Sequence, residues 1–204
     1  MTLLFVRHGE TALNAARVMQ PADTPLSPRG QAQAQAVAQR LAAMQPVALL
    51  SSDLPRALQT AEAIAAATGL PVQTTPLLHE RNFGDFRGRP HASFDFDPVT
   101  MDEAPPDGES MPEFLDRVVR AFDAAVRLRA TLHGPLVVVS HGLVIRALLG
   151  PQVALAAGVA PPARIGNTSV TEVEAEPPHR ALRVDCLQHL RGAVAEDGQS
   201  LSGG

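Results

Sequence analysis

The chain has 204 residues, of which 45% are hydrophobic, 19% are charged and 3% are aromatic. This length and composition predict one folded domain with a substantial buried core. The net charge of −4 argues against a surface that mainly binds nucleic acid, and no apolar run is long enough to cross a membrane. The single cysteine, Cys186, excludes an internal disulfide, so we expect a reducing, cytoplasmic location. We expect no signal peptide, because a strand-like run begins at Thr2.

Strand-like and helix-like segments alternate along the chain. The expected strands are Thr2–Val6, Val47–Leu50, Val72–Thr74, Leu136–Val139, Ser169–Glu174 and Ala181–Leu187. The expected helices are Pro28–Met44, Pro55–Thr68, Pro112–Leu132 and Leu143–Leu149. The alternation predicts an α/β fold, namely a three-layer α/β/α sandwich around a largely parallel sheet. We expect the last two strands, separated by Pro177 and Pro178, to form an antiparallel hairpin at the sheet edge, with Cys186 packed in the core.

Two segments lack this pattern. Residues 84–110 are rich in Pro, Gly, Asp and Phe and show no regular periodicity, which is typical of a lid or binding loop. Residues 192–204 are polar and rich in Gly and Ser, so we expect a flexible tail. The predicted organisation is therefore one domain over residues 1–191, with an inserted lid segment at 84–110, followed by that tail.

Two strand-like runs end in the same way, at a His-Gly pair. The first expected strand runs into Arg7, His8 and Gly9, and the strand Leu136–Val139 runs into Ser140-His141-Gly142. If these strands are parallel neighbours, both histidines lie at the sheet edge where open α/β folds bind their ligands. The adjacent guanidinium of Arg7 would repel a metal ion but can bind a phosphate through two hydrogen bonds. The pattern therefore favours a phosphoryl-binding site over a metal site.

Other polar residues stand at comparable positions. Arg56 lies in the first turn of the expected helix Pro55–Thr68, which follows a strand, and the free N–H groups at a helix N-terminus favour an anion. Glu80 follows another strand, and a carboxyl there could give a proton to a leaving alcohol and then take one from water. Taken singly, Arg56 is more typical of a solvated surface, and Glu80 could pair with Arg81. Asn14 could hold a phosphate oxygen. These residues indicate a phosphoryl-binding site because all of them are expected at the same edge of the sheet.

These residues stand in segments that resemble the histidine phosphatase superfamily, in its phosphoglycerate-mutase-like branch. The matching segments are Arg7-His8-Gly9-Glu10-Thr11 with Asn14, Leu26-Ser27-Pro28-Arg29-Gly30, Ser52-Asp53-Leu54-Pro55-Arg56-Ala57 with Gln59-Thr60, Glu80-Arg81-Asn82-Phe83-Gly84, Gly108-Glu109-Ser110, Ser140-His141-Gly142 and Asn167-Thr168-Ser169. They occur in the family's order. One departure is Pro21, which stands where the family often has a glycine and which removes an N–H near the pocket.

The resemblance implies a metal-independent phosphatase that needs no cofactor. In this family His8 would be the nucleophile that becomes phosphorylated, Glu80 the proton donor, and His141 a catalytic partner. The residues implied to bind the phosphate are Arg7, Asn14, Arg56, His141, Gly142 and Leu143.

The same pocket can pass a phosphoryl group to water or to a second alcohol. Between residues 81 and 109 the chain has seven acidic residues and three arginines, a balance that opposes a polyanionic bisphosphate. We therefore expect hydrolysis of a small-molecule phosphate monoester, selected in part by Phe86, Arg87 and Arg89. Phosphoglycerate-mutase-type transfer, an α-ribazole phosphate phosphatase and a non-enzymatic phosphate-ester-binding protein are the alternatives. We expect no nucleic-acid or membrane partner, and the oligomeric state, a homodimer included, is left open.

Overall fold

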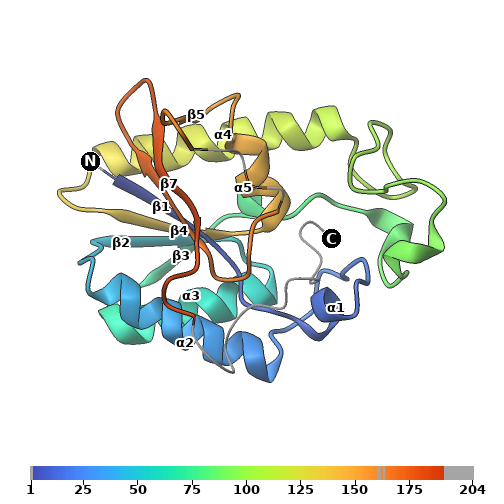
Figure 1. Ribbon diagram of the computed structural model, residues 1–204, viewed down its shortest axis with the longest axis horizontal. Helices are drawn as coiled ribbons and strands as arrows, with labels where there is room; N and C mark the ends of the chain where they lie inside the picture. The colour runs from blue at the N-terminus through green and yellow to red at the C-terminus, as the bar shows by residue number, and fades with distance from the viewer. Residues whose placement is uncertain (1, 160–161, 163, 191–204) are drawn as a thin grey trace.

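A seven-stranded sheet forms the centre of the molecule (Figure 1). The computed structural model describes residues 2–159, 162 and 164–190, so the predicted tail at 192–204 lies outside the described residues. The strands, in their spatial order, are β3 (Val72–Thr74), β2 (Ala48–Ser51), β4 (Leu136–Ser140), β1 (Thr2–Arg7), β6 (Val170–Glu174), β7 (Arg180–Cys186) and β5 (Ala154–Leu155).

Helices cover both faces of this sheet. The helices α2 (Pro28–Ala42) and α3 (Pro55–Thr68) pack on one face, and α4 (Met111–Ala130) and α5 (Gly142–Leu148) pack on the other (Figure 1). The short helix α1 (Ala12–Ala15) follows β1. The predicted α/β sandwich is confirmed. Among the described residues, no helix is long and apolar enough to cross a membrane.

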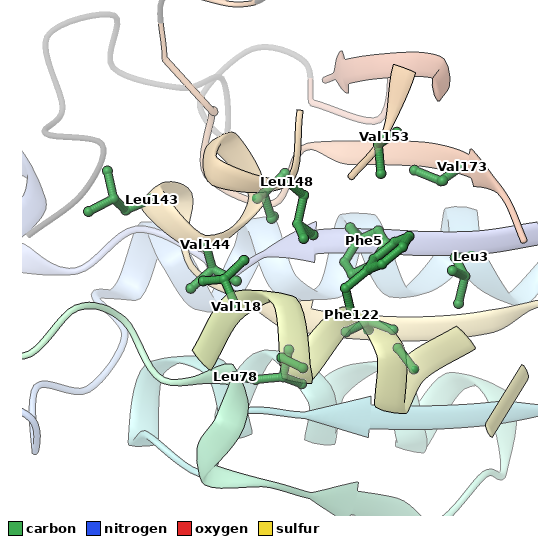
Figure 2. Packing of buried hydrophobic residues seen from close by; sticks show 14 of the residues in the cluster. Leu3, Phe5, Leu78, Val118, Phe122, Leu143, Val144, Leu148, Val153 and Val173 are labelled. Atoms are coloured by element: carbon green, nitrogen blue, oxygen red, sulfur yellow. The ribbon is translucent and has the colours of Figure 1, made fainter. Parts of the chain in front are cut away.

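Strand β1 shows why its apolar run is continuous. Successive side chains point to opposite faces, so Leu3 and Phe5 join the cluster under α4 and α5, whereas Leu4 and Val6 join the cluster under α2 and α3. Figure 2 shows the first cluster, in which the ring of Phe5 stacks on that of Phe122 at a centroid distance of 6.2 Å. Because both faces are covered, the strand has apolar side chains at every position from Leu3 to Val6.

The strands that precede the candidate residues run in one direction. β1 pairs with β4 in parallel, with Arg7 opposite Ser140, and β2 pairs in parallel with both β4 and β3. The carboxyl ends of all four strands therefore meet at one edge of the sheet, as the sequence pattern predicts.

The end of the sheet differs from the prediction. β6 and β7 are antiparallel neighbours, but β5 pairs in parallel with β7 and takes the edge position. The expected edge hairpin is therefore an interior pair. Cys186 is only partly buried and lies outside both core clusters, and its Sγ accepts a hydrogen bond from Arg40 Nη2 at 3.3 Å. The prediction of a packed core thiol is wrong, because Cys186, the last residue of β7, keeps part of its surface exposed.

Residues 84–110 contain only short 3₁₀ helices at Gly84–Phe86 and His91–Ser93. Backbone hydrogen bonds join this segment to residues 17–19: Gly88 N–H donates to Met19 O at 2.7 Å, and Met19 N–H donates to Arg89 O at 2.9 Å. At its other end, Ser110 caps α4 in a reciprocal capping box with Glu113. The segment is thus tied to its surroundings at both ends.

Candidate active site

His8 follows the last residue of β1 and is almost completely buried. Its backbone N–H donates to Ser140 O at 2.9 Å, which links the ends of β1 and β4. The ring Nδ1 lies 2.7 Å from Gly9 O, and since a carbonyl can only accept, Nδ1 carries the proton. Burial, followed by the charges of Arg56 and Arg7, holds the pKa of His8 well below its usual range. The imidazole is therefore neutral, with an unprotonated Nε2.

The backbone next to His8 packs closely against the start of α2. Gly9 N–H donates to Thr60 Oγ1 at 3.0 Å. A Cβ on Gly9 would come within 2.5 Å of the carbonyl oxygen of Gly30, so the His-Gly pair needs a glycine here.

His141 lies beside His8, with ring centroids 5.1 Å apart. It is fully buried and precedes α5 as its N-cap residue. Its Nε2 lies 2.9 Å from Ser52 Oγ, while Nδ1 has no hydrogen-bond partner among the residues that the structure describes. Burial, then the charges of Arg56 and of a protonated His8, lower the pKa of His141 well below its usual range. If the Ser52 hydroxyl donates to Nε2, the Nδ1–H is available to an oxyanion.

Two arginines bring positive charge to this pocket. Arg7 is fully buried and donates from Nη1 to Ile165 O at 2.6 Å. Arg56 stands in the first turn of α3 and is 2% exposed. Within the described part of the chain, its guanidinium makes only long hydrogen bonds, of 3.4 Å, to the carbonyls of Pro21 and Ala22. Burial lowers the pKa of Arg56 to about 10, opposed by Glu80 and assisted by Arg7. Two buried guanidinium groups of like charge in one pocket favour an anion between them.

Glu80 lies in the loop between the 3₁₀ helices Pro76–Leu78 and Gly84–Phe86, and it is 5% exposed. One carboxyl oxygen accepts from Arg81 N–H at 3.1 Å and the other accepts from Leu143 N–H at 3.1 Å. Burial raises the pKa of Glu80, against these two hydrogen bonds and the charges of Arg56 and Arg7. The alternative in which Glu80 pairs with the Arg81 side chain does not hold, since that guanidinium binds the carbonyls of Val99, Met101, Glu103 and Glu109.

The other predicted phosphate contacts lie at the same edge. Asn14 is fully buried in α1, and its Oδ1 accepts from Asn167 Nδ2 at 3.4 Å. Asn167 Nδ2 also donates to His8 O at 3.1 Å. Gly142 begins α5 directly after His141. The backbone N–H of Leu143 is donated to Glu80 in this structure, so this residue orients a carboxyl rather than standing open to a ligand.

Ser52, Thr60 and Asn167 were not expected as site residues. Each contacts a residue of the pocket through its side chain: Ser52 contacts His141, Thr60 contacts Gly9, and Asn167 contacts His8. All three stood inside the segments that resemble the superfamily, which was the only signal that could have found them. Among the described residues, no group of three or more His, Cys, Asp or Glu side chains is arranged to hold a metal ion.

A cleft of about 480 Å³ opens beside Glu80. Its lining includes Leu54, His79, Asn82, Arg87, Glu109 and Arg117. Of the three predicted specificity residues, Arg87 lines this cleft, whereas Arg89 lies over the ring of Phe94, 4.2 Å from its centroid. Phe86, Phe94 and Phe96 pack on one another at centroid distances of 4.8, 6.0 and 5.6 Å.

Comparison with known proteins identifies the family. The chain matches the family model described as Histidine phosphatase superfamily (branch 1) over residues 3–185. The chain belongs to this superfamily. A relative named "Probable phosphoglycerate mutase GpmB", from Yersinia pestis (strain Pestoides F), is 37% identical over 189 residues, which cover 85% of each chain.

Solved structures of similar proteins agree with this assignment. A mycobacterial glucosyl-3-phosphoglycerate phosphatase, solved in complex with VO3, is 31% identical, with a TM-score of 0.74 over 91% of this chain and 97% of that one. Bacillus stearothermophilus YhfR is 27% identical, with a TM-score of 0.77 over 92% of this chain and 98% of that one. The predicted superfamily and the prediction of a phosphatase enzyme are confirmed.

Proposed function

We propose that this histidine phosphatase hydrolyses a small-molecule phosphate monoester through a phosphohistidine at His8. The observation that carries the proposal is the state of His8: a buried imidazole whose Nδ1 proton is held by Gly9 O and whose pKa is lowered by burial and two arginines. A neutral ring with a free Nε2 lone pair, next to anion-binding guanidinium groups, is what attack on phosphorus requires.

In the first half-reaction, Nε2 of His8 attacks phosphorus and forms a P–N bond. The P–O bond to the alcohol breaks, and the departing oxygen takes the proton of the Glu80 carboxyl. Arg7, Arg56 and the Nδ1–H of His141 bind the phosphoryl oxygens, while Asn14 and the N–H of Gly142 complete the pocket. Fixed positive groups of this kind stabilise the charge that spreads over the phosphoryl oxygens in the transition state.

In the second half-reaction, the ionised Glu80 removes a proton from water as the water oxygen attacks phosphorus. The P–N bond breaks, its electron pair returns to Nε2 of His8, and inorganic phosphate leaves. Glu80 is then protonated again, so one carboxyl serves as acid and as base. The raised pKa of Glu80 suits the first role at neutral pH.

The cleft beside Glu80 is the proposed site for the alcohol part of the substrate. Among the described residues, the Arg87 guanidinium has no ion-pair or hydrogen-bond partner, whereas Glu109 is paired with Arg117 at 2.7 Å. The part of residues 81–109 that lines the cleft therefore has no excess of acidic side chains, so the charge argument against a bisphosphate does not apply to this part of the lining. Phosphoryl transfer to a second alcohol, as in the relative named a phosphoglycerate mutase, stays the alternative.

A rapid-quench experiment tests the proposal. With a ³²P-labelled monoester, such as glycerol phosphate or a phosphoglycerate, we expect label on the protein that is lost in acid and stable in base. His8→Ala should abolish the label, while His133→Ala, an exposed histidine before β4, should keep it. Label in His8→Ala would refute the assignment. Addition of glycerol or glycerate during turnover separates the two reactions, because a mutase transfers label to the alcohol and a hydrolase releases phosphate.

A further inference from the structure

The motif Gly108-Glu109-Ser110 supplies a residue that the proposed chemistry does not use. The Glu109 carboxylate binds the guanidinium of Arg117, on α4, through two hydrogen bonds: Nε donates to Oε1 at 2.8 Å and Nη2 donates to Oε2 at 2.7 Å. The Arg117 and Glu109 side chains are only 14% and 16% exposed. A paired fork of this kind is stronger and more directional than a surface ion pair.

The same two residues bind the backbone on both sides of Glu80. Nη1 of Arg117 donates to Leu77 O at 2.9 Å and to His79 O at 2.7 Å, and Nη2 donates to Glu80 O at 3.3 Å. On the other side, Oε2 of Glu109 accepts from Asn82 N–H at 3.2 Å, and Glu109 N–H donates to Asn82 O at 2.8 Å. The ion pair therefore bridges the backbone from residue 77 to residue 82.

Glu80 needs such support because it lies in neither a helix nor a strand. Its carboxyl meets Leu143 N–H across the pocket, and that contact depends on where the loop holds its Cα. Proton transfer to a leaving oxygen requires placement within a fraction of an ångström. We propose that the Glu109–Arg117 pair positions Glu80 for proton transfer, so that both are positioning residues for the proposed reaction. This inference rests on the proposed role of Glu80.

The decisive variant is Arg117→Lys, because lysine keeps the charge but cannot hold one carboxylate and three carbonyls with a planar fork. Glu109→Gln tests the other partner with nearly the same shape. The matched control is Arg127→Lys, an exposed arginine on the same helix that does not line the cleft beside Glu80. We expect the control to behave as the unmodified enzyme.

The readout is the ratio of kcat/KM for an alkyl phosphate to kcat/KM for p-nitrophenyl phosphate. The first leaving group needs the proton of Glu80 and the second hardly does. Arg117→Lys should lower this ratio about tenfold or more, as expected from misplacement of a catalytic group, and should leave vanadate inhibition within about twofold. Arg117→Lys in the Glu80→Gln background should lower the ratio no further, since the two changes remove one function. If Arg117→Lys only reduced the amount of folded enzyme, kcat/KM would fall by the same factor for both substrates and the ratio would not change. An unchanged ratio in Arg117→Lys therefore overturns the inference.

A measurement without substrate separates this inference from the proposed function. The ¹³C resonance of the Glu80 carboxyl is identified by its absence in Glu80→Gln, and its titration gives the pKa of Glu80. If the ion pair holds the loop, Arg117→Lys weakens the hydrogen bonds from Leu143 and Arg81 and raises that pKa further. An unchanged pKa overturns the positioning role. If Glu80→Gln leaves the ratio of the two kcat/KM values unchanged, Glu80 is not the proton donor and the proposed function fails at this residue. The titration then still tests whether the ion pair positions the Glu80 carboxyl.

Discussion

Replacement of Arg56 should affect stability and phosphate binding in opposite directions. Arg56 is 2% exposed and lies near Arg7 without a close carboxylate hydrogen bond, so its charge is costly until an anion binds. Burial lowers its pKa to about 10. Relative to an ordinary arginine, this change corresponds to a cost of about 3 kcal/mol for the charged form. Arg56→Met keeps most of the aliphatic stem and removes this cost.

We therefore expect ligand-free Arg56→Met to be more stable by about 1–3 kcal/mol, since changed packing offsets part of the gain. For a domain of this size, this raises Tm by about 2–4 °C for each kcal/mol. Phosphate at 100 times its dissociation constant protects the unmodified protein by about 2.7 kcal/mol. If the guanidinium contributes about 3 kcal/mol to oxyanion binding, the same phosphate concentration should protect the variant by only about 0.3 kcal/mol.

Thermal unfolding with and without phosphate measures both effects. The control is Arg129→Met, another buried arginine, whose Nη1 donates to Leu132 O at 2.7 Å. Its loss should lower the ligand-free Tm, because that carbonyl loses its donor, and should leave the phosphate protection unchanged. A lower Tm for ligand-free Arg56→Met together with full phosphate protection would show that Arg56 is a structural residue and not part of the phosphate pocket.

Three further predictions follow from the charges of the site. Because burial lowers the folded-state pKa values of His8 and His141, their stabilising contribution is complete above about pH 6.5 and is lost as the pH falls below it. Urea unfolding should therefore give a lower free energy of unfolding at pH 5.5 than at pH 7.5, and His8→Asn should reduce this difference. Equal free energies at the two pH values would contradict the prediction. Because burial raises the pKa of Glu80, kcat/KM for alkyl phosphates should fall as the pH rises through that pKa. If Glu80→Gln shows the same fall of kcat/KM with rising pH, another group is responsible for it. Arg87→Ala should change the ranking of monoesters and leave vanadate affinity nearly intact, whereas an equal loss on every ester would place specificity elsewhere.

Local sequence patterns were sufficient for the framework of this protein. The bounds of α3, Pro55–Thr68, follow from a proline that starts a helix and a glycine that takes the left-handed conformation after it. The apolar runs before His8 and His141 predict buried parallel strands, and parallel strands bring their carboxyl ends to one edge. The convergence of the two histidines could therefore be predicted, because it depends only on strand direction and order. Glu80 and Asn14 were also candidates from the sequence itself, and the resemblance to a family implied the same roles for them.

Only the tertiary structure decided how the site is held. Sequence spacing does not show that Arg117 meets Glu109 and the carbonyls around Glu80, that Leu143 N–H serves the Glu80 carboxyl, or that Arg87 lines the cleft while Arg89 covers Phe94. The edge position of β5 beside β7 was missed for the same reason. A strand or helix is specified by neighbours within a few residues, whereas the partner of a long polar side chain is set by segments that are distant in the chain and meet only when the layers pack.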